Sequence, residues 1–160
     1  MELVFEMKYI EAEKRIKALL EENLHDSLQN IVDYLYESFE KYSWLGVYFV
    51  KGNHMFLGPW KGKQATENVK IPIGVGVCGS AAKTGKTEIV QDVKNDMRYL
   101  SCFISTRSEI VVPIMKNNVI IAEIDIDSDQ INAFNEKDKK LLENIANNKS
   151  FVNLIMKNIR

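Results

Sequence analysis

The 160-residue sequence has few of the residues that build metal centres or disulfide frameworks, with only 2 cysteines and 2 histidines. His25 and His54 stand at no metal-ligand spacing from each other or from a cysteine, so no metal site is predicted. No apolar run approaches the roughly 18 residues that a membrane span requires. The net charge of −1 provides no broad basic surface for nucleic acid or for an anionic membrane.

The N-terminal segment 1–6 carries acids where a secretory signal would carry bases. We therefore expect a cytoplasmic protein, in which thiols stay reduced and a disulfide is transient rather than structural. With 46% hydrophobic and 27% charged residues, the composition is that of an ordinary globular protein. The chain is long enough for one core without staples, so a single domain over 1–160 is predicted.

Apolar periodicity predicts a helix from about Tyr9 to Lys41, with an interruption near 23–27 that could divide it into two. Aromatic and β-branched residues predict a hairpin of strands 44–50 and 54–57, after which 58–63 is expected to be irregular. The remaining expected elements are strand 69–73, a short helix 79–84, strand 87–90, a long loop 92–107, hairpin strands 109–115 and 119–127, and a final helix from about 134. This order predicts an α+β fold with a mainly antiparallel central sheet and the N- and C-terminal helices packed on one face.

Cys102 lies in the expected loop 92–107, and loops of that length in compact domains are usually functional or disordered. A thiol attacks as its thiolate, and at neutral pH only about 3% of an unperturbed cysteine is ionised. Arg98 and Arg107 of the same loop could supply the positive charge that favours the thiolate. The alternative is a free cysteine that packs as a small hydrophobic residue.

Cys78 follows Gly74 and Gly76 and precedes the expected short helix. Glycines let the backbone approach a ligand closely, and the start of a helix favours a thiolate. The segment is not a phosphate-binding loop, because no Gly-Lys-Ser/Thr follows at the required spacing. The alternative is a tight strand-to-helix turn with a buried, unreactive thiol.

Acids alternate with isoleucines near residue 125, which predicts a strand with Glu123, Asp125 and Asp127 on one face. Two carboxylates about 7 Å apart at their Cα atoms can hold an ammonium group, or deliver a proton if one pKa is raised. The alternative is a solvated acidic face, although aspartate is a poor strand former. Trp44 and Tyr48 share a strand face, either as core aromatics or as the walls of a site for a small cation or a soft sulfur group.

Five blocks of the sequence resemble, in order, the free methionine-R-sulfoxide reductases, a family of single GAF domains. The resemblance runs from about Ser43 to Asp138, and both cysteines stand at matching positions. The blocks are 43–48, 57–63, 71–79, 108–113 and 124–128. The resemblance implies the GAF fold and reduction of the sulfoxide of free methionine, not of methionine in proteins.

The resemblance also implies roles for individual residues. Cys102 corresponds to the nucleophile, whose thiolate attacks the sulfoxide sulfur, releases methionine and becomes a sulfenic acid. The implied substrate-binding residues are an aromatic wall and three carboxylates for the substrate ammonium, namely Trp44, Tyr48, Glu109, Asp125 and Asp127. One of the three acids is expected to be protonated for this step.

Two positions depart from the family pattern. Asn68 stands where members commonly carry a third, resolving cysteine, so either Cys78 resolves oxidised Cys102 or an external thiol does. Phe103 stands where the family tends to place an acid, which affects loop packing or substrate affinity. The implied partner is a thioredoxin-like or small thiol reductant, with no bound cofactor. The long amphipathic helices and the family are both compatible with a symmetric homodimer.

Two functions of another class remain alternatives to the reductase. One is a GAF module that binds a small ligand without turnover. The other is a redox sensor in which Cys78 and Cys102 form a reversible disulfide.

Overall fold

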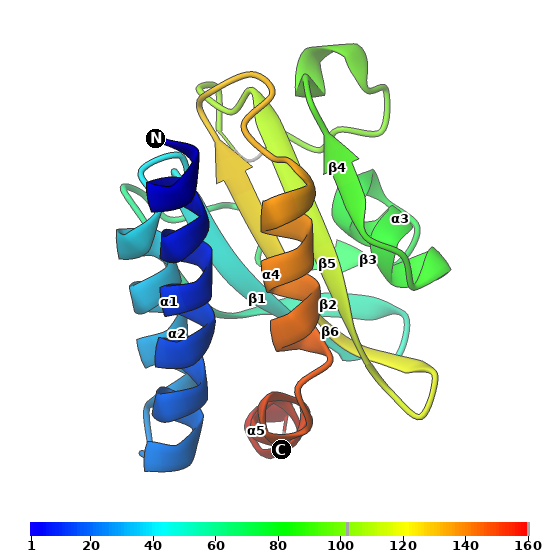
Figure 1. Cartoon of the computed structure of the whole chain (residues 1–160). Coiled ribbons are helices and arrows are strands. Elements are labelled where there is room, and N and C mark those ends of the chain that lie inside the picture. Colours follow the sequence, from blue (N-terminus) through cyan, green and yellow to red (C-terminus); the bar gives the residue numbers. More distant parts are fainter. Residues whose placement is uncertain (102, 160) are drawn as a thin grey trace.

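The computed structural model describes residues 1–101 and 103–159, and its centre is an antiparallel sheet. Its strands are β1 (Trp44–Lys51), β2 (His54–Gly62), β3 (Lys70–Pro72), β4 (Glu88–Val90), β5 (Ser108–Lys116) and β6 (Val119–Ser128). They lie in the order β3-β2-β1-β6-β5-β4 (Figure 1). The helices are α1 (Glu2–Glu22), α2 (Ser27–Ser38), α3 (Gly76–Thr84), α4 (Glu136–Ala146) and α5 (Lys149–Ile159), with a 3₁₀ turn, η1 (Val93–Asn95).

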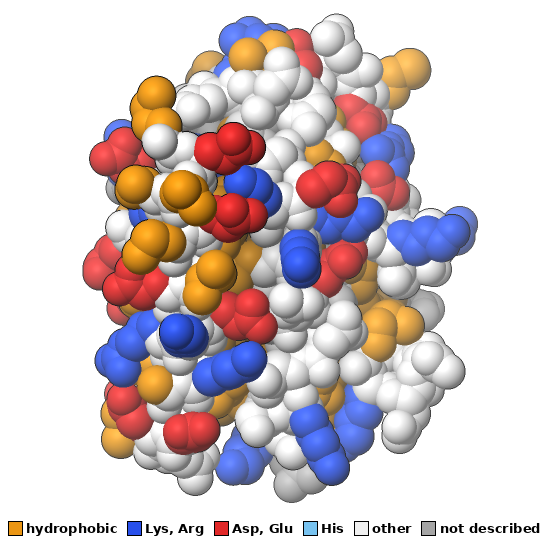
Figure 2. All heavy atoms as spheres, in the orientation of Figure 1, with side chains coloured by type: hydrophobic (Ala, Val, Ile, Leu, Met, Phe, Trp, Pro, Cys, Tyr) orange, Lys and Arg blue, Asp and Glu red, His pale blue; other side chains and the backbone are white. Residues whose placement is uncertain are grey.

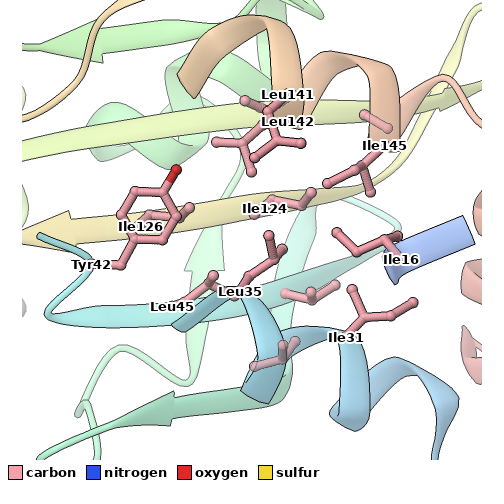
Figure 3. Close-up of a cluster of buried hydrophobic side chains, with 14 of the residues drawn as sticks. Ile16, Ile31, Leu35, Tyr42, Leu45, Ile124, Ile126, Leu141, Leu142 and Ile145 are labelled. Carbon is pink, nitrogen blue, oxygen red and sulfur yellow. The ribbon is translucent and has the colours of Figure 1, made fainter. Parts of the chain in front are cut away.

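The two faces of the sheet carry different side chains, because successive strand residues point to opposite sides. Leu45 and Val47 of β1, with Ile124 and Ile126 of β6, point to the face covered by α1, α2, α4 and α5. Figure 3 shows these isoleucines meeting Ile16, Ile31, Leu35, Leu141, Leu142 and Ile145. Each buried side chain of this size contributes about 1.5–3 kcal/mol, so this helical face holds the main core. The predicted fold, with the terminal helices packed on one face, is confirmed.

The opposite face of the sheet is covered by α3 and holds a second, smaller core. Trp44 and Tyr48 of β1, with Val111 of β5, point to this side and pack with residues of α3 such as Ala81 and Ala82. The acids of β6 lie on the same face, one residue out of phase with its isoleucines. This second face therefore positions the residues singled out in the sequence.

The predicted break in the first helical segment is confirmed. The predicted start of that segment and the prediction of a single final helix are wrong. Asn23 ends α1 in the left-handed conformation with φ 45°, and α1 begins at Glu2 rather than near Tyr9. The final segment divides into α4 and α5 because Oδ1 of Asn148 accepts hydrogen bonds from the backbone N–H groups of Ser150 and Phe151 and so caps a new helix.

The expected irregular segment 58–63 is instead mostly strand, because β2 continues to Gly62. The register against β1 shifts between Gly46 and Tyr48, where β2 holds Pro59 at an irregularity. A bulge is a place where a strand tolerates a proline, which has no N–H to donate to the ladder. The turn after β5 uses Asn117 and Asn118 with φ 51° and 62°, as the predicted hairpin requires.

The surface of α1 is unusual for an outer helix. Leu3, Val4, Phe5 and Met7 are each more than half exposed. Figure 2 shows hydrophobic side chains gathered over the end of α1 nearest the N-terminus. Among the described residues, no helix is both long and apolar enough to span a membrane.

Candidate active site

Four carboxyl groups lie together under α3, and we call them the acid cluster: Glu109, Glu123, Asp125 and Asp127. The alternation on β6 is confirmed, and Glu109 of β5 stands opposite Asp127 in the strand register. None of the four side chains belongs to a residue more than 3% exposed. The alternative of a solvated acidic face is therefore excluded.

The carboxyl oxygens of the acid cluster accept almost no hydrogen bonds from the described residues. Both oxygens of Glu123, Asp125 and Asp127, and Oε2 of Glu109, lack a hydrogen-bond partner among the described residues. No ion pair in the described part of the chain involves any of the four. Buried charges are normally paired or hydrogen-bonded, so the cluster is built to receive a cation or to hold protons.

Burial shifts the proton affinity of every member of the acid cluster. It raises the pKa of Glu109, Glu123 and Asp127 well above the ordinary values, and the neighbouring carboxylate of Asp125 adds to the rise. Burial also raises the pKa of Asp125, to about 6. At neutral pH the cluster therefore holds protons, and it has a carboxyl group ready to supply one.

Cys78 brings a thiol into the acid cluster from the first turn of α3. Its Sγ donates to Oε1 of Glu109 at 3.7 Å. Burial raises the pKa of the thiol well above its ordinary value, and the nearby carboxyl groups of Asp125 and Glu123 raise it further. The expectation that the helix start favours a thiolate is wrong, because desolvation and negative neighbours outweigh the helix dipole.

The glycine run makes this placement of α3 achievable. Gly74 and Gly76 have φ of 92° and 73°, which side-chain-bearing residues rarely adopt. A Cβ on Gly79 would lie 2.8 Å from backbone atoms of Pro72 and Gly74. The absence of a side chain there lets α3 pack directly on the preceding turn, which sets Cys78 against the sheet.

Trp44 forms one wall beside the acid cluster, opposite Asp127 in the register between β1 and β6. A Cβ on Gly46 or on Gly62 would collide with the indole ring, so both glycines leave the space in which it lies. The ring stacks on Trp60 with centroids 6.3 Å apart, and its Nε1 has no acceptor among the described residues. A buried donor is thus available beside the carboxyl groups.

Tyr48 stands opposite Glu123 in the same register and is fully buried. Its hydroxyl donates to the carbonyl oxygen of Asn68 at 2.8 Å, and Asn68 Nδ2 donates to the carbonyl oxygen of Ser101 at 3.2 Å. Asn68 therefore links β1 to the loop before β5.

Cys102, the predicted nucleophile, lies outside the described residues. The residues before and after it contact the site: Phe103 packs against Trp44 with centroids 6.0 Å apart, and Ser101 accepts from Asn68. The arginines expected to assist a thiolate are held in ion pairs. Arg98 pairs with Glu88 and with Asp96, whose carboxylate raises the pKa of the guanidinium further, and Arg107 lies 3.7 Å from Asp92.

Two spaces adjoin the site. A pocket of about 250 Å³ is bordered by Trp44, Phe103 and Asp127. A cavity of about 10 Å³, large enough for about one water, lies between Cys78, Glu109 and Leu100. The cavity beside Cys78 and Glu109 is therefore much smaller than the pocket beside Trp44 and Asp127.

Two features of the site were not predicted from the sequence. Glu123 was placed on the acid face but given no role, although the same alternation that identified Asp125 and Asp127 includes it. The sequence also predicted no metal site, whereas Cys78 Sγ, one oxygen of Glu109 and one of Asp125 all lie within 4.8 Å of one another. These groups come from α3, β5 and β6, so no sequence spacing relates them.

The chain belongs to the GAF domain family, whose model matches residues 21–152. Within it, the chain belongs to the free methionine-R-sulfoxide reductases, oxidoreductases that act on a sulfoxide. The reductase of Escherichia coli is 34% identical over 120 residues, covering 75% of this chain and 72% of that protein.

Two solved reductase structures resemble this one along nearly their whole length. That of the type II enzyme from Thermoplasma acidophilum is 36% identical with TM-score 0.79, covering 87% of this chain and 96% of that one. That of the Neisseria meningitidis enzyme in complex with its substrate is 30% identical with TM-score 0.82, covering 93% of this chain and 88% of that one. The expected GAF fold is confirmed.

Proposed function

We propose that this protein reduces the R-sulfoxide of free methionine to methionine. The observation that carries the proposal is the acid cluster, which is buried, is walled by Trp44 and, among the described residues, has one hydrogen bond, from Cys78 to Glu109. A free amino acid brings the ammonium group that such a cluster lacks. In a protein chain that nitrogen is an uncharged amide, which cannot neutralise buried carboxylates.

Binding of the ammonium group is assigned to Glu109, Asp125 and Asp127, with Glu123 as the fourth buried carboxyl of the cluster. An ammonium ion has three N–H donors, so three carboxyl groups can each accept one. The attraction is strong because the site is desolvated and holds no competing cation among the described residues. Trp44 and Tyr48 then flank the side chain, and the unpaired indole N–H of Trp44 can donate to a substrate oxygen.

In the chemical step, the Cys102 thiolate attacks the sulfoxide sulfur while the sulfoxide oxygen receives a proton. The oxygen passes to cysteine: the S–O bond of the substrate breaks, the thiol becomes a sulfenic acid and the thioether of methionine leaves. Two electrons move from the cysteine sulfur to the substrate sulfur. Because the pKa values of Glu109 and Asp127 are raised, either carboxyl can hold the proton near neutral pH.

The protonation state of Cys78 indicates how oxidised Cys102 is reduced again. A thiol that is held protonated among carboxyl groups attacks slowly, because the thiolate is the nucleophile. We therefore propose that an external thiol of the cytoplasm, small or thioredoxin-like, condenses with the sulfenic acid, releasing water and forming a mixed disulfide. A second thiol then reduces this disulfide and returns Cys102 to its thiol form. Cys78 then acts mainly as a neutral thiol that donates to Glu109 within the site.

The test is formation of methionine from free methionine-R-sulfoxide with dithiothreitol as reductant. We expect Cys102→Ser to abolish product and Cys78→Ser to keep the first turnover. Equal loss in both variants would contradict the assigned roles. Saturable binding of the sulfoxide without any methionine formed would favour the ligand-binding alternative. A disulfide between the two cysteines that forms reversibly, without substrate, would favour the redox sensor.

A further inference from the structure

The acid cluster contains one group that ammonium recognition does not need, the thiol of Cys78. Its Sγ lies 3.7 Å from Oε1 of Glu109, and both lie within 4.8 Å of a carboxyl oxygen of Asp125. Asp125 is fully buried, and neither of its oxygens has a partner among the described residues. One sulfur and two oxygens from three separate elements thus lie close to one another.

The separation of the Cys78 and Glu109 ligand atoms is close to the spacing of ligand atoms around a small divalent cation. With Zn–S near 2.3 Å and Zn–O near 2.0–2.2 Å, neighbouring ligand atoms on a tetrahedral zinc ion lie about 3.5 Å apart. The Cys78–Glu109 pair is already close to that distance. The cavity beside these two residues has a volume of about 10 Å³, enough for one ion or water but not for an amino acid.

The ligand set selects the kind of metal. Magnesium and calcium prefer oxygen ligands alone, whereas a thiolate with carboxylates suits zinc or the softer cadmium. Binding would replace the thiol proton of Cys78 with the metal and neutralise carboxylates that otherwise repel each other. The ligands already stand on α3, β5 and β6, so the ion would also tie α3 to the sheet.

We propose that Cys78, Glu109 and Asp125 form a binding site for a soft divalent cation, zinc or cadmium, and that an ion held there excludes the ammonium group of the substrate. The second half of this inference rests on the proposed reductase function; the first half does not. The ion is an inhibitor in this scheme, because it occupies two of the carboxylates assigned to the substrate.

The test is titration of the reduced, metal-free full chain with Cd²⁺, followed by the thiolate-to-cadmium charge-transfer absorption. We expect one equivalent to produce the band. Cys78→Ser should abolish it, and Asp125→Asn should weaken binding by more than roughly tenfold, the loss seen even for outer-shell partners of a metal. Glu123→Gln is the matched control: it removes a neighbouring buried carboxyl that is not a ligand, and the band should persist.

Cys102→Ser separates the two thiols, and the band should persist in that variant too. A band that survives Cys78→Ser, or one that disappears with Cys102→Ser, would overturn the assignment, as would the absence of a band in the wild-type chain. Circular dichroism of each variant shows that it is folded before its titration is interpreted.

Inhibition is measured separately, as the rate of methionine formation with and without Zn²⁺. We expect inhibition that is competitive with methionine sulfoxide and reversed by a chelator. If a higher concentration of methionine sulfoxide does not relieve the inhibition, the ion does not compete with the substrate and this part of the proposal is wrong. A Cys78-dependent cadmium band in a protein that produces no methionine even without metal would refute the reductase function while supporting the metal site.

Discussion

Asp138 and Asp125 are both fully buried, yet their surroundings are opposite. Asp138 accepts from the hydroxyls of Tyr9 at 3.0 Å and Tyr42 at 2.9 Å, and it pairs with Lys41 at 2.6 Å. The oxygens of Asp125 have no partner among the described residues. A paired carboxylate holds a fold together, whereas an unpaired one destabilises the empty protein and is retained for what it binds.

This contrast predicts how stability depends on pH in the metal-free, unliganded protein. The pKa of Asp125 rises from 3.8 to about 6 on folding, so its protonated form favours the folded state. That contribution is fully present below about pH 4 and is lost as the pH rises through about 6, at a cost of about 3 kcal/mol by linkage. We expect the thermal midpoint to fall between about pH 4 and pH 7. A midpoint that stays level or rises would contradict the assigned burial.

Asp125→Asn should remove the part of this dependence that comes from Asp125. The variant should be more stable than the wild type at about pH 8, by up to about 3 kcal/mol, and should differ little at about pH 3, where Asp125 is protonated in both states. Urea unfolding at the two pH values measures the difference. Asp138→Asn is the paired control and should have the opposite sign, losing about 3 kcal/mol because it leaves Lys41 without its buried partner.

At the scale of elements, α3 determines where the thiol meets the acids. We expect Gly79→Ala to destabilise the protein by about 1–3 kcal/mol, since the added Cβ lies 2.8 Å from backbone that cannot move aside cheaply. The variant should also weaken cadmium binding, because α3 must shift away from Glu109. Gly52→Asn, at a positive-φ turn with open space around it, is the control and should change neither. If urea unfolding gives Gly79→Ala the same free energy of unfolding as the wild type, α3 does not pack on the preceding turn as closely as the 2.8 Å distance indicates.

The strands that carry the site were predictable from side-chain alternation. Asp125 and Asp127 alternate with isoleucines, and that pattern correctly placed them on the face away from the main core. The extension of β2 through Pro59 was not predictable, because the bulge that accommodates a proline depends on its partner strand. The division of the last helix was missed because Asn148 acts as a cap, which its helical surroundings in the sequence do not reveal.

The chemistry of the site was only partly predictable. Period two indicates which acids share a face, but not what covers that face. Glu123 is buried because α3 and Phe103 cover this face of the sheet. The same burial raises the pKa of the Cys78 thiol, whereas the start of a helix was expected to lower it. The aromatic wall at Trp44 likewise depends on two glycines from different strands that make room for the ring.

At the scale of the molecule, the end of α1 nearest the N-terminus carries exposed hydrophobic side chains, which gather on the face that Figure 2 shows. Leu3, Val4, Phe5 and Met7 are between 61% and 77% exposed. An exposed group of large apolar side chains on a soluble chain is typical of a protein–protein contact. A second copy of the chain, in the homodimer expected from the sequence, would cover these residues.

We therefore predict that the protein is a dimer at micromolar concentration and that Phe5→Glu shifts it toward monomer, because a charge would be buried at the interface. Light scattering coupled to size exclusion measures the mass. Lys63→Glu, a charge change at a residue exposed far along the chain from α1, is the control and should leave the dimer intact. A wild-type chain that runs as a monomer would contradict the prediction.

The most direct measurement compares kcat/KM for free L-methionine-R-sulfoxide with that for its N-acetyl derivative, which has the same sulfoxide but no ammonium group. If the acid cluster binds that ammonium, the free amino acid should be preferred by about 100-fold, the equivalent of roughly 3 kcal/mol for a buried charge pair. Asp125→Asn should remove most of the preference. Equal rates for the two substrates, or a preference that Asp125→Asn leaves intact, would contradict recognition of a free amino acid by these carboxyl groups.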